Sequence, residues 1–158
     1  MSSEEDRKRN DLIYKIIVDR YDLEWKRTND LDTKASNVTG IAGILTALMA
    51  GISGFFQQAH YKWLFLIPLT FLIFSAISGL WAYWISSFDA INPNVLIEEY
   101  KETAETKILE DVSATMSKHT MHNFLVNQRK VRRIYGAFIF LVLAIGLFFA
   151  FAIMNSVM

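Results

Sequence analysis

Four oxygen-bearing side chains recur at a spacing of seven residues: Asp32, Thr39, Thr46 and Ser53. A seven-residue spacing returns to nearly the same side of an α-helix, so one carboxylate and three hydroxyls would form a column along one face. Hydroxyls beside a hydrated path, with a ring of carboxylates at its mouth, are suited to cation permeation. These four residues are therefore the candidate lining of a pore.

The same residues allow a purely structural interpretation, which the spacing alone favours. Thr and Ser within an apolar helix often bond to their own i−4 carbonyl group or to a neighbouring helix. Asp32 would then pair locally, either with Lys34 or with Lys26 and Arg27.

The elements that must position this column are membrane spans. The chain has 158 residues with 16 basic and 16 acidic side chains, yet residues 35–56, 63–88 and 134–158 contain no charged residue. About 20 apolar residues cross the hydrocarbon layer, and a charge at its centre costs about 3 kcal/mol. A soluble domain of this length could bury one such helix, but not three. We therefore expect an all-α integral membrane protein with three transmembrane helices.

The basic residues predict the orientation of these spans. Eight precede the first span, one lies between the first two, seven lie between the second and third, and none follows. The positive-inside rule then gives a cytoplasmic N-terminal amphipathic helix (1–34), TM1 (35–56), an extracytoplasmic turn (57–62), TM2 (63–88), a cytoplasmic helical loop (89–133) and TM3 (134–158). The expected location is the cell's inner membrane, with the C-terminus outside and no cleaved leader.

Aromatic and basic residues gather at the predicted span ends, where they would anchor the protein in the membrane. Aromatic side chains favour the headgroup level, and a basic cluster directly before a span fixes orientation and can meet anionic lipid. We favour an orientation anchor over specific lipid recognition for the cluster. The predicted anchoring residues are Trp63, Trp81, Trp84, Arg129, Lys130, Arg132 and Arg133.

Span one is rich in small residues at steps of three or four, which predicts close helix packing. Its candidate packing residues are Ser36, Gly40, Gly43, Ala47 and Gly51. In lipid the hydrophobic effect does not drive helices together, so they associate through close packing. Small side chains allow this because they let helix backbones approach closely. We expect span one to be the innermost helix of a homo-oligomeric bundle.

Both polar segments are expected to be helices that continue into the spans. Neither Gly nor Pro occurs between Asn10 and Val38 or between Asn94 and Tyr135. Two apolar stripes are expected, Ile13, Ile17, Tyr21 and Trp25 in the first segment and Ile97, Tyr100, Ala104, Ile108 and Val112 in the second. The stripes would bundle as a stalk, in preference to lying flat on the lipid. Asn92, Pro93 and Asn94 would end the helix leaving span two, and a break is allowed near residues 117–120.

Other chemistry finds little support in the sequence. There is no cysteine, no catalytic motif and no pair of acids within a span, so we expect no catalytic residue, no cofactor and no enzyme activity. His119 and His122 share a helical face but lack a third ligand, so a solvated patch is favoured over a metal site. Balanced charge gives no case for nucleic-acid binding. The expected partners are membrane lipids, further copies of the chain and permeating ions.

The segment from Glu24 to Ala35 contains Asp32-x-Lys34-Ala35 at the foot of a Gly-rich first span, with a second span soon after. This arrangement, over residues 12–88, resembles SLATT-type membrane domains and the related Pycsar membrane effectors of prokaryotic defence systems. The resemblance implies a regulated membrane protein that forms pores or disrupts the inner membrane. The chain differs from a minimal two-span plan in its third span and return helix, and it shows no nucleotide-sensing domain.

Two hypotheses follow. The first is an oligomeric pore or ion channel, lined by span one and controlled by an unidentified signal. The second is a membrane-anchored scaffold or accessory subunit that docks a cytoplasmic partner through its helices.

Overall fold

The computed structural model describes residues 3–56, 62–85 and 105–157, and these residues are almost entirely helical. The long helix α1 (Ser3–Ile52) continues into a short 3-10 helix (Ser53–Phe56). A second 3-10 helix (Lys62–Phe65) leads into α2 (Leu66–Trp84), and α4 (Glu105–Val157) ends the described chain. No strand occurs within these ranges, so the all-α prediction is confirmed for the described residues.

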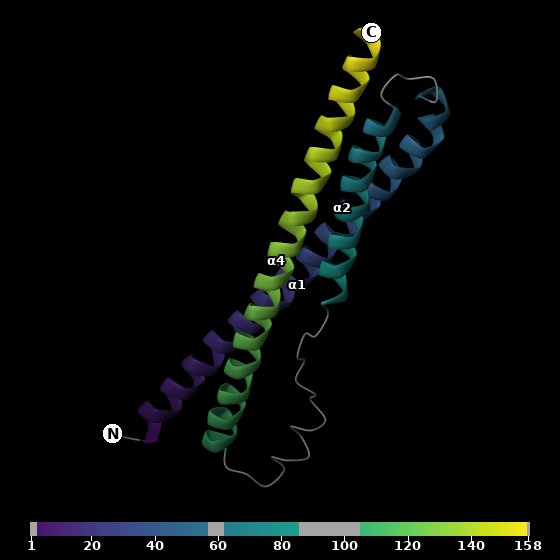
Figure 1. The fold of residues 1–158 in the computed structure, drawn as a ribbon. Helices are drawn as coiled ribbons and strands as arrows, with labels where there is room; N and C mark the ends of the chain where they lie inside the picture. The colour runs from purple at the N-terminus through teal and green to yellow at the C-terminus, as the bar shows by residue number, and fades with distance from the viewer. Residues whose placement is uncertain (1–2, 57–61, 86–104, 158) are drawn as a thin grey trace. The chain divides into compact units, whose positions relative to one another are not determined.

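The chain divides into two compact units, each built from separate parts of the sequence. The polar unit combines Met1–Asn29 with Ser87–Gln128, and the apolar unit combines Asp30–Ser86 with Arg129–Met158. Each unit therefore draws on part of α1 and part of α4, and the apolar unit also contains α2. Figure 1 shows α2 beside the second halves of α1 and α4.

The three helices of the apolar unit pack through residues that alternate steps of three and four. Buried positions are Leu31, Ala35, Val38, Ala42 and Met49 on α1, Pro68, Leu72, Ser75, Gly79 and Ala82 on α2, and Ala137, Leu141, Ala144 and Phe151 on α4. Such alternation averages 3.5 residues, close to one helical repeat, so each row keeps facing its neighbours. The ring of Phe65 makes an edge contact with Phe148 and a tilted contact with Phe151, and the ring of Phe71 makes a tilted contact with Phe140.

The outward surface of the apolar unit is covered by large apolar side chains. Ile44, Leu48, Ile73, Phe138 and Ile153 are among those that are about half exposed or more. All three long helices contain a stretch long and apolar enough to cross a membrane. Exposed apolar helices whose backbone groups are bonded internally are suited to lipid, which indicates a membrane-associated protein.

The second span begins with a turn of 3-10 helix. Its described helical residues run from Lys62 to Trp84, and the last residues of the predicted span, 86–88, lie outside the described residues. Pro68 falls in the first turn of α2, where a missing backbone N–H removes no intrahelical bond. Pro68 therefore does not interrupt the helix, which begins at Leu66.

In the polar unit the predicted stripe on α1 is only partly correct. Ile17 and Tyr21 are half-buried, and Ile13, though 42% exposed, lies on the side that faces α4. Trp25 is 48% exposed and turns away, while Glu24 and Thr28 face inward. A row of strict four-residue steps rotates about 40° per step, so it turns away from a partner helix within a few turns. The facing row instead alternates steps of four and three through Ile17, Tyr21, Glu24 and Thr28.

The predicted return helix is continuous in its described part. On α4, Val112 is buried and Ile108 half-buried, and the helix has no break at residues 117–120. The residues Asn92, Pro93, Asn94, Ile97, Tyr100 and Ala104 lie outside the described residues.

Candidate functional site

A buried ion pair joins α1 to α4 at the charged end of the apolar unit. Lys130 Nζ donates to Asp32 Oδ1 at 2.7 Å, and the side chains are 1% and 28% exposed, respectively. Lys130 is the largest fully buried side chain among the described residues. Removing a charge from water is costly unless a partner compensates it, so each member of this pair holds the other in place.

This pair corrects two expectations. Asp32 bonds across to Lys130 and not to Lys34, because residues two apart on a helix point to different faces. Arg27 contacts Glu24 instead, at 3.5 Å. Lys130 itself was expected among the membrane anchors, but its ammonium is buried against Asp32 and cannot face lipid headgroups.

The hydroxyls of the predicted column all bond to their own helix. Thr39 Oγ1 donates to the Ala35 carbonyl at 2.9 Å, Thr46 Oγ1 to that of Ala42 at 2.7 Å, and Ser53 Oγ to that of Ala50 at 2.7 Å. This is the structural interpretation left open by the sequence. Thr39 and Thr46 remain half-buried and Ser53 is exposed.

Thr39 has a second role as a packing residue against α2. A side chain at Gly79 would place its Cβ on Thr39 Oγ1, 3.5 Å from Thr39 Cβ and 3.4 Å from the Ala35 carbonyl oxygen. Gly79 therefore lets α1 and α2 approach closely, and the Thr39 hydroxyl lies in that contact. Ser75, four residues earlier, donates to the Ala137 carbonyl of α4 at 2.7 Å.

Gly79 and Ser75 are contact residues that the sequence reasoning missed. The sequence does contain the signal, because the small residues Ser75, Gly79 and Ala82 follow one another at steps of four and three. Span two has a single glycine against four in span one, so composition alone does not indicate this contact.

The predicted packing face of span one makes no close helix contact with the described residues of its own chain. Ser36, Gly40, Gly43, Ala47 and Gly51 are all exposed. A Cβ built on any of these three glycines would meet nothing within 4 Å. The buried row of α1 lies on another side of the helix. The small-residue face, defined as these five residues, is therefore not covered by any described part of the same chain.

The predicted anchors, apart from Lys130, lie at the surface. Trp63, Trp81, Trp84, Arg129, Arg132 and Arg133 are exposed, and the Arg133 guanidinium carbon lies 4.1 Å from the centroid of the Trp81 ring. The stacked pair joins α2 to α4 at the same end of the apolar unit as Lys130. An arginine held on an indole face keeps its edge free for other contacts.

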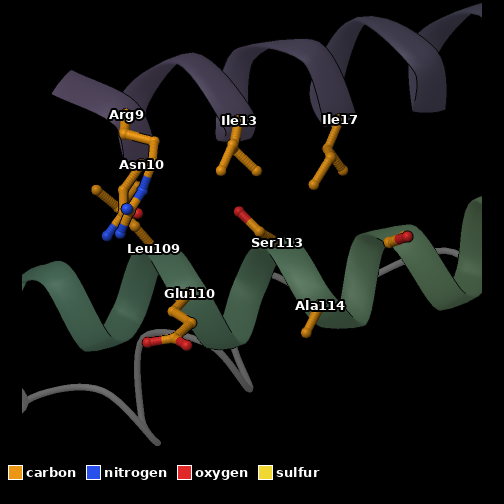
Figure 2. A pocket seen from close by; sticks show the side chains of 9 residues that line it. Arg9, Asn10, Ile13, Ile17, Leu109, Glu110, Ser113 and Ala114 are labelled. Carbon is orange, nitrogen blue, oxygen red and sulfur yellow. The ribbon is translucent and has the colours of Figure 1, made fainter. Parts of the chain in front are cut away.

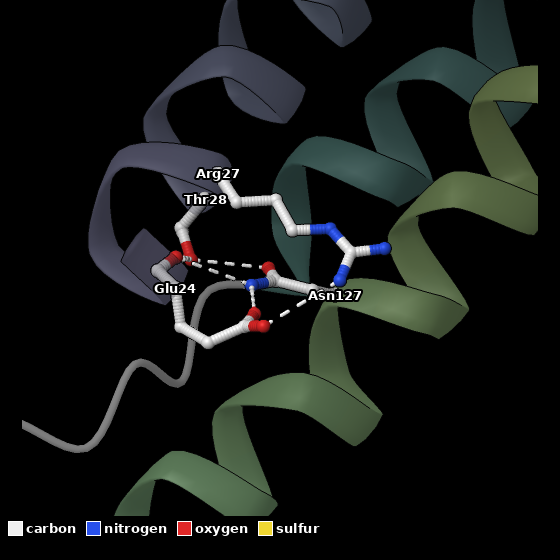
Figure 3. Close-up of polar contacts among 4 residues, drawn as sticks. All are labelled: Glu24, Arg27, Thr28 and Asn127. Atoms are coloured by element: carbon white, nitrogen blue, oxygen red, sulfur yellow. Dashed lines mark hydrogen bonds and ion pairs between the residues drawn. The ribbon is translucent and has the colours of Figure 1, made fainter. Parts of the chain in front are cut away.

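In the polar unit, Asn127 of α4 connects to two residues of α1 (Figure 3). Its amide nitrogen donates to Glu24 Oε2 at 2.8 Å, and its oxygen lies 3.0 Å from Thr28 Oγ1. Asn127 is fully buried. Beside it, the guanidinium carbon of Arg27 on α1 lies 5.6 Å from the ring centroid of Phe124 on α4. A satisfied buried amide fixes the register of two helices more sharply than apolar contacts do.

The polar unit also contains an open cavity of about 390 Å³ between α1 and α4. Figure 2 shows Ile13 and Ile17 directed from α1 toward α4, with the Ser113 hydroxyl directed back toward α1. Arg9, Asn10 and Glu110 complete its polar part. No group of three or more His, Cys, Asp or Glu side chains suited to a metal occurs among the described residues.

Comparison with protein-family models, curated proteins and solved structures finds no match to this chain. The function of the chain is therefore inferred from the arrangement of its own residues.

Proposed function

We propose that the chain is one subunit of a homo-oligomeric membrane pore or ion channel whose copies meet through the small-residue face of α1. The observation that carries the proposal is that this face is exposed although it lies on a helix apolar enough to span a membrane. Apolar side chains gain little by leaving lipid for protein, whereas a face of small residues gains close backbone contact. The small-residue face of a second copy would allow the two α1 backbones to approach closely.

The neighbouring surface of α1 supports an arrangement of copies around an axis. Ile41, Ile44 and Leu48, on a different side of the helix, are large, apolar and exposed, as lipid contact requires. Three spans cannot enclose a path by themselves, so conduction needs several copies. Of the predicted lining, Thr46 and Ser53 are retained, since Thr39 is engaged by α2.

Asp32 would lie at the cytoplasmic mouth of the pore. With 28% of its side chain exposed, the carboxylate retains contact with water while Lys130 offsets part of its charge. An acidic ring reduced in this way would attract cations without binding them tightly, which conduction requires.

The proposed placement follows the basic residues. The polar unit and the N-terminus would face the cytoplasm and the C-terminus the outside of the inner membrane. The resemblance to SLATT-type and Pycsar-type effectors supports a role in regulated membrane permeation, with a signal still to be identified.

The experiment is ion flux from liposomes containing the purified full-length protein. We expect the unaltered chain to pass cations, Thr46→Leu to lower the flux severalfold by adding apolar bulk to the path, and Gly43→Leu to abolish flux by preventing close approach. Ile41→Leu, on the lipid-facing side, is the matched control and should leave flux unchanged. Silent liposomes containing folded oligomers of the unaltered chain would refute the pore.

A membrane-anchored scaffold or accessory subunit remains the second candidate, because the polar unit exposes apolar residues as well. Leu12, Ile16 and Leu23 lie on one side of α1 and are each more than half exposed. Under this alternative, cross-linking recovers a cytoplasmic partner that is lost when the three residues become serine, and liposomes show no flux.

A further inference from the structure

We infer that three arginines at the start of the third span form a binding site for the headgroup of an anionic phospholipid. Arg129, Arg132 and Arg133 are exposed, and none is paired with a carboxylate among the described residues. Arg132 and Arg133 lie three and four residues after Arg129, which places all three on one face of α4. The inference does not depend on pore formation.

The buried ion pair separates these arginines from the fourth basic residue of the cluster. Lys130 points into the apolar unit toward Asp32, so it neither competes for an anion nor leaves Asp32 free to repel one. What remains at the surface is a set of planar guanidinium groups. These match phosphate oxygens with paired N–H donors better than an ammonium does.

Trp81 gives the site a fixed wall. The Arg133 guanidinium carbon lies 4.1 Å from its ring centroid, so stacking limits the side chain's freedom before any ligand arrives. Aromatic rings of this kind favour the headgroup level of a bilayer. The arginines and the indole therefore meet where a lipid phosphate would lie.

The same face of α4 continues into a surface suited to an acyl chain. Gly136 lies one turn after Arg132 and has open space where a side chain would be. Ile139 and Leu143 follow at steps of three and four and are about 45% exposed. Along α4 the arginines would meet the phosphate, the open space at Gly136 would admit the glycerol region, and Ile139 and Leu143 would contact an acyl chain. This order favours a lipid over a free phosphate ion.

The test is native mass spectrometry of the delipidated full-length protein, titrated with phosphatidylglycerol and, separately, with phosphatidylcholine. We expect preference for the anionic lipid and loss of about fivefold in affinity for each Arg→Gln change at 129, 132 or 133, so roughly 100-fold for the triple variant. Arg20→Gln, which removes the same charge from the polar unit, should bind as the unaltered chain does.

Three further measurements distinguish a specific lipid site from general attraction between arginines and anionic lipid. Arg133→Lys keeps the charge but loses the planar stack, and we expect it to weaken binding severalfold. Gly136→Leu fills the gap and should weaken lipid binding as well. Glycerol phosphate at the same concentration should not displace the lipid.

Equal affinity for the two lipids, equal losses in the triple and Arg20→Gln variants, full binding by Arg133→Lys, or displacement by glycerol phosphate would each overturn the assignment. Helical circular dichroism of every variant establishes that it folds, which is expected because the replaced arginines are exposed.

Discussion

Asp32→Asn should lower the free energy of unfolding by about 3 kcal/mol, because it leaves the Lys130 ammonium buried without an opposite charge. The lysine is 1% exposed and cannot recover its hydration without displacing the helices around it. The measurement is the loss of helical circular dichroism in mixed micelles as the fraction of denaturing detergent rises.

The two partners should respond unequally. Lys130→Met leaves a carboxylate that is already 28% exposed and can be hydrated in place, so this variant should lose less stability than Asp32→Asn. The double variant, with neither charge, should recover most of the loss, since an apolar replacement of a buried pair is often tolerated. Equal losses in the two single variants, or no recovery in the double, would contradict this account of the pair.

Gly79→Ala should destabilise the apolar unit by about 2 kcal/mol, as overpacking of a close contact typically does. The added Cβ would occupy the position of Thr39 Oγ1, and α2 would have to move away from α1. The same detergent titration measures the effect.

Thr39→Ala tests the cause. Without the hydroxyl and methyl of Thr39, the nearest atoms to the new Cβ would be the Ala35 carbonyl oxygen at 3.4 Å and the Cβ of residue 39 at 3.5 Å, both acceptable contacts. Thr39→Ala with Gly79→Ala should therefore be more stable than Gly79→Ala alone. Gly43→Ala, where a Cβ meets nothing within 4 Å, is the matched control and should not lower the single chain's stability, since Ala also favours the helix.

The three spans could be predicted from the sequence because length and lack of charge are local properties. A run such as residues 134–158 is recognised from its own length and lack of charge, whatever its neighbours are. The own-helix bonds of Thr39 and Thr46 were equally local, since each acceptor lies four residues earlier on the same helix.

The contacts between helices could not be obtained in the same way. Asp32 and Lys130 are 98 residues apart, and several basic residues lie much closer to Asp32 in the sequence. The sequence alone therefore does not indicate which of them is its partner. The small residues of span one predict close packing but do not indicate which helix would provide it. In the structure a close contact between α1 and α2 lies at Gly79, and no described residue covers Gly40, Gly43 or Gly51.

The most direct test of the account is whether copies meet through the small-residue face of α1. The chain has no cysteine, so a single introduced cysteine reports one position without background. Ala47→Cys lies on that face, and Ile41→Cys lies about 120° away on the apolar side by helical geometry. Both positions are exposed, so accessibility alone does not separate them. Oxidation in native membranes should give disulfide-linked dimers with Ala47→Cys and monomers with Ile41→Cys; dimers at Ile41 and none at Ala47 would contradict the proposed assembly.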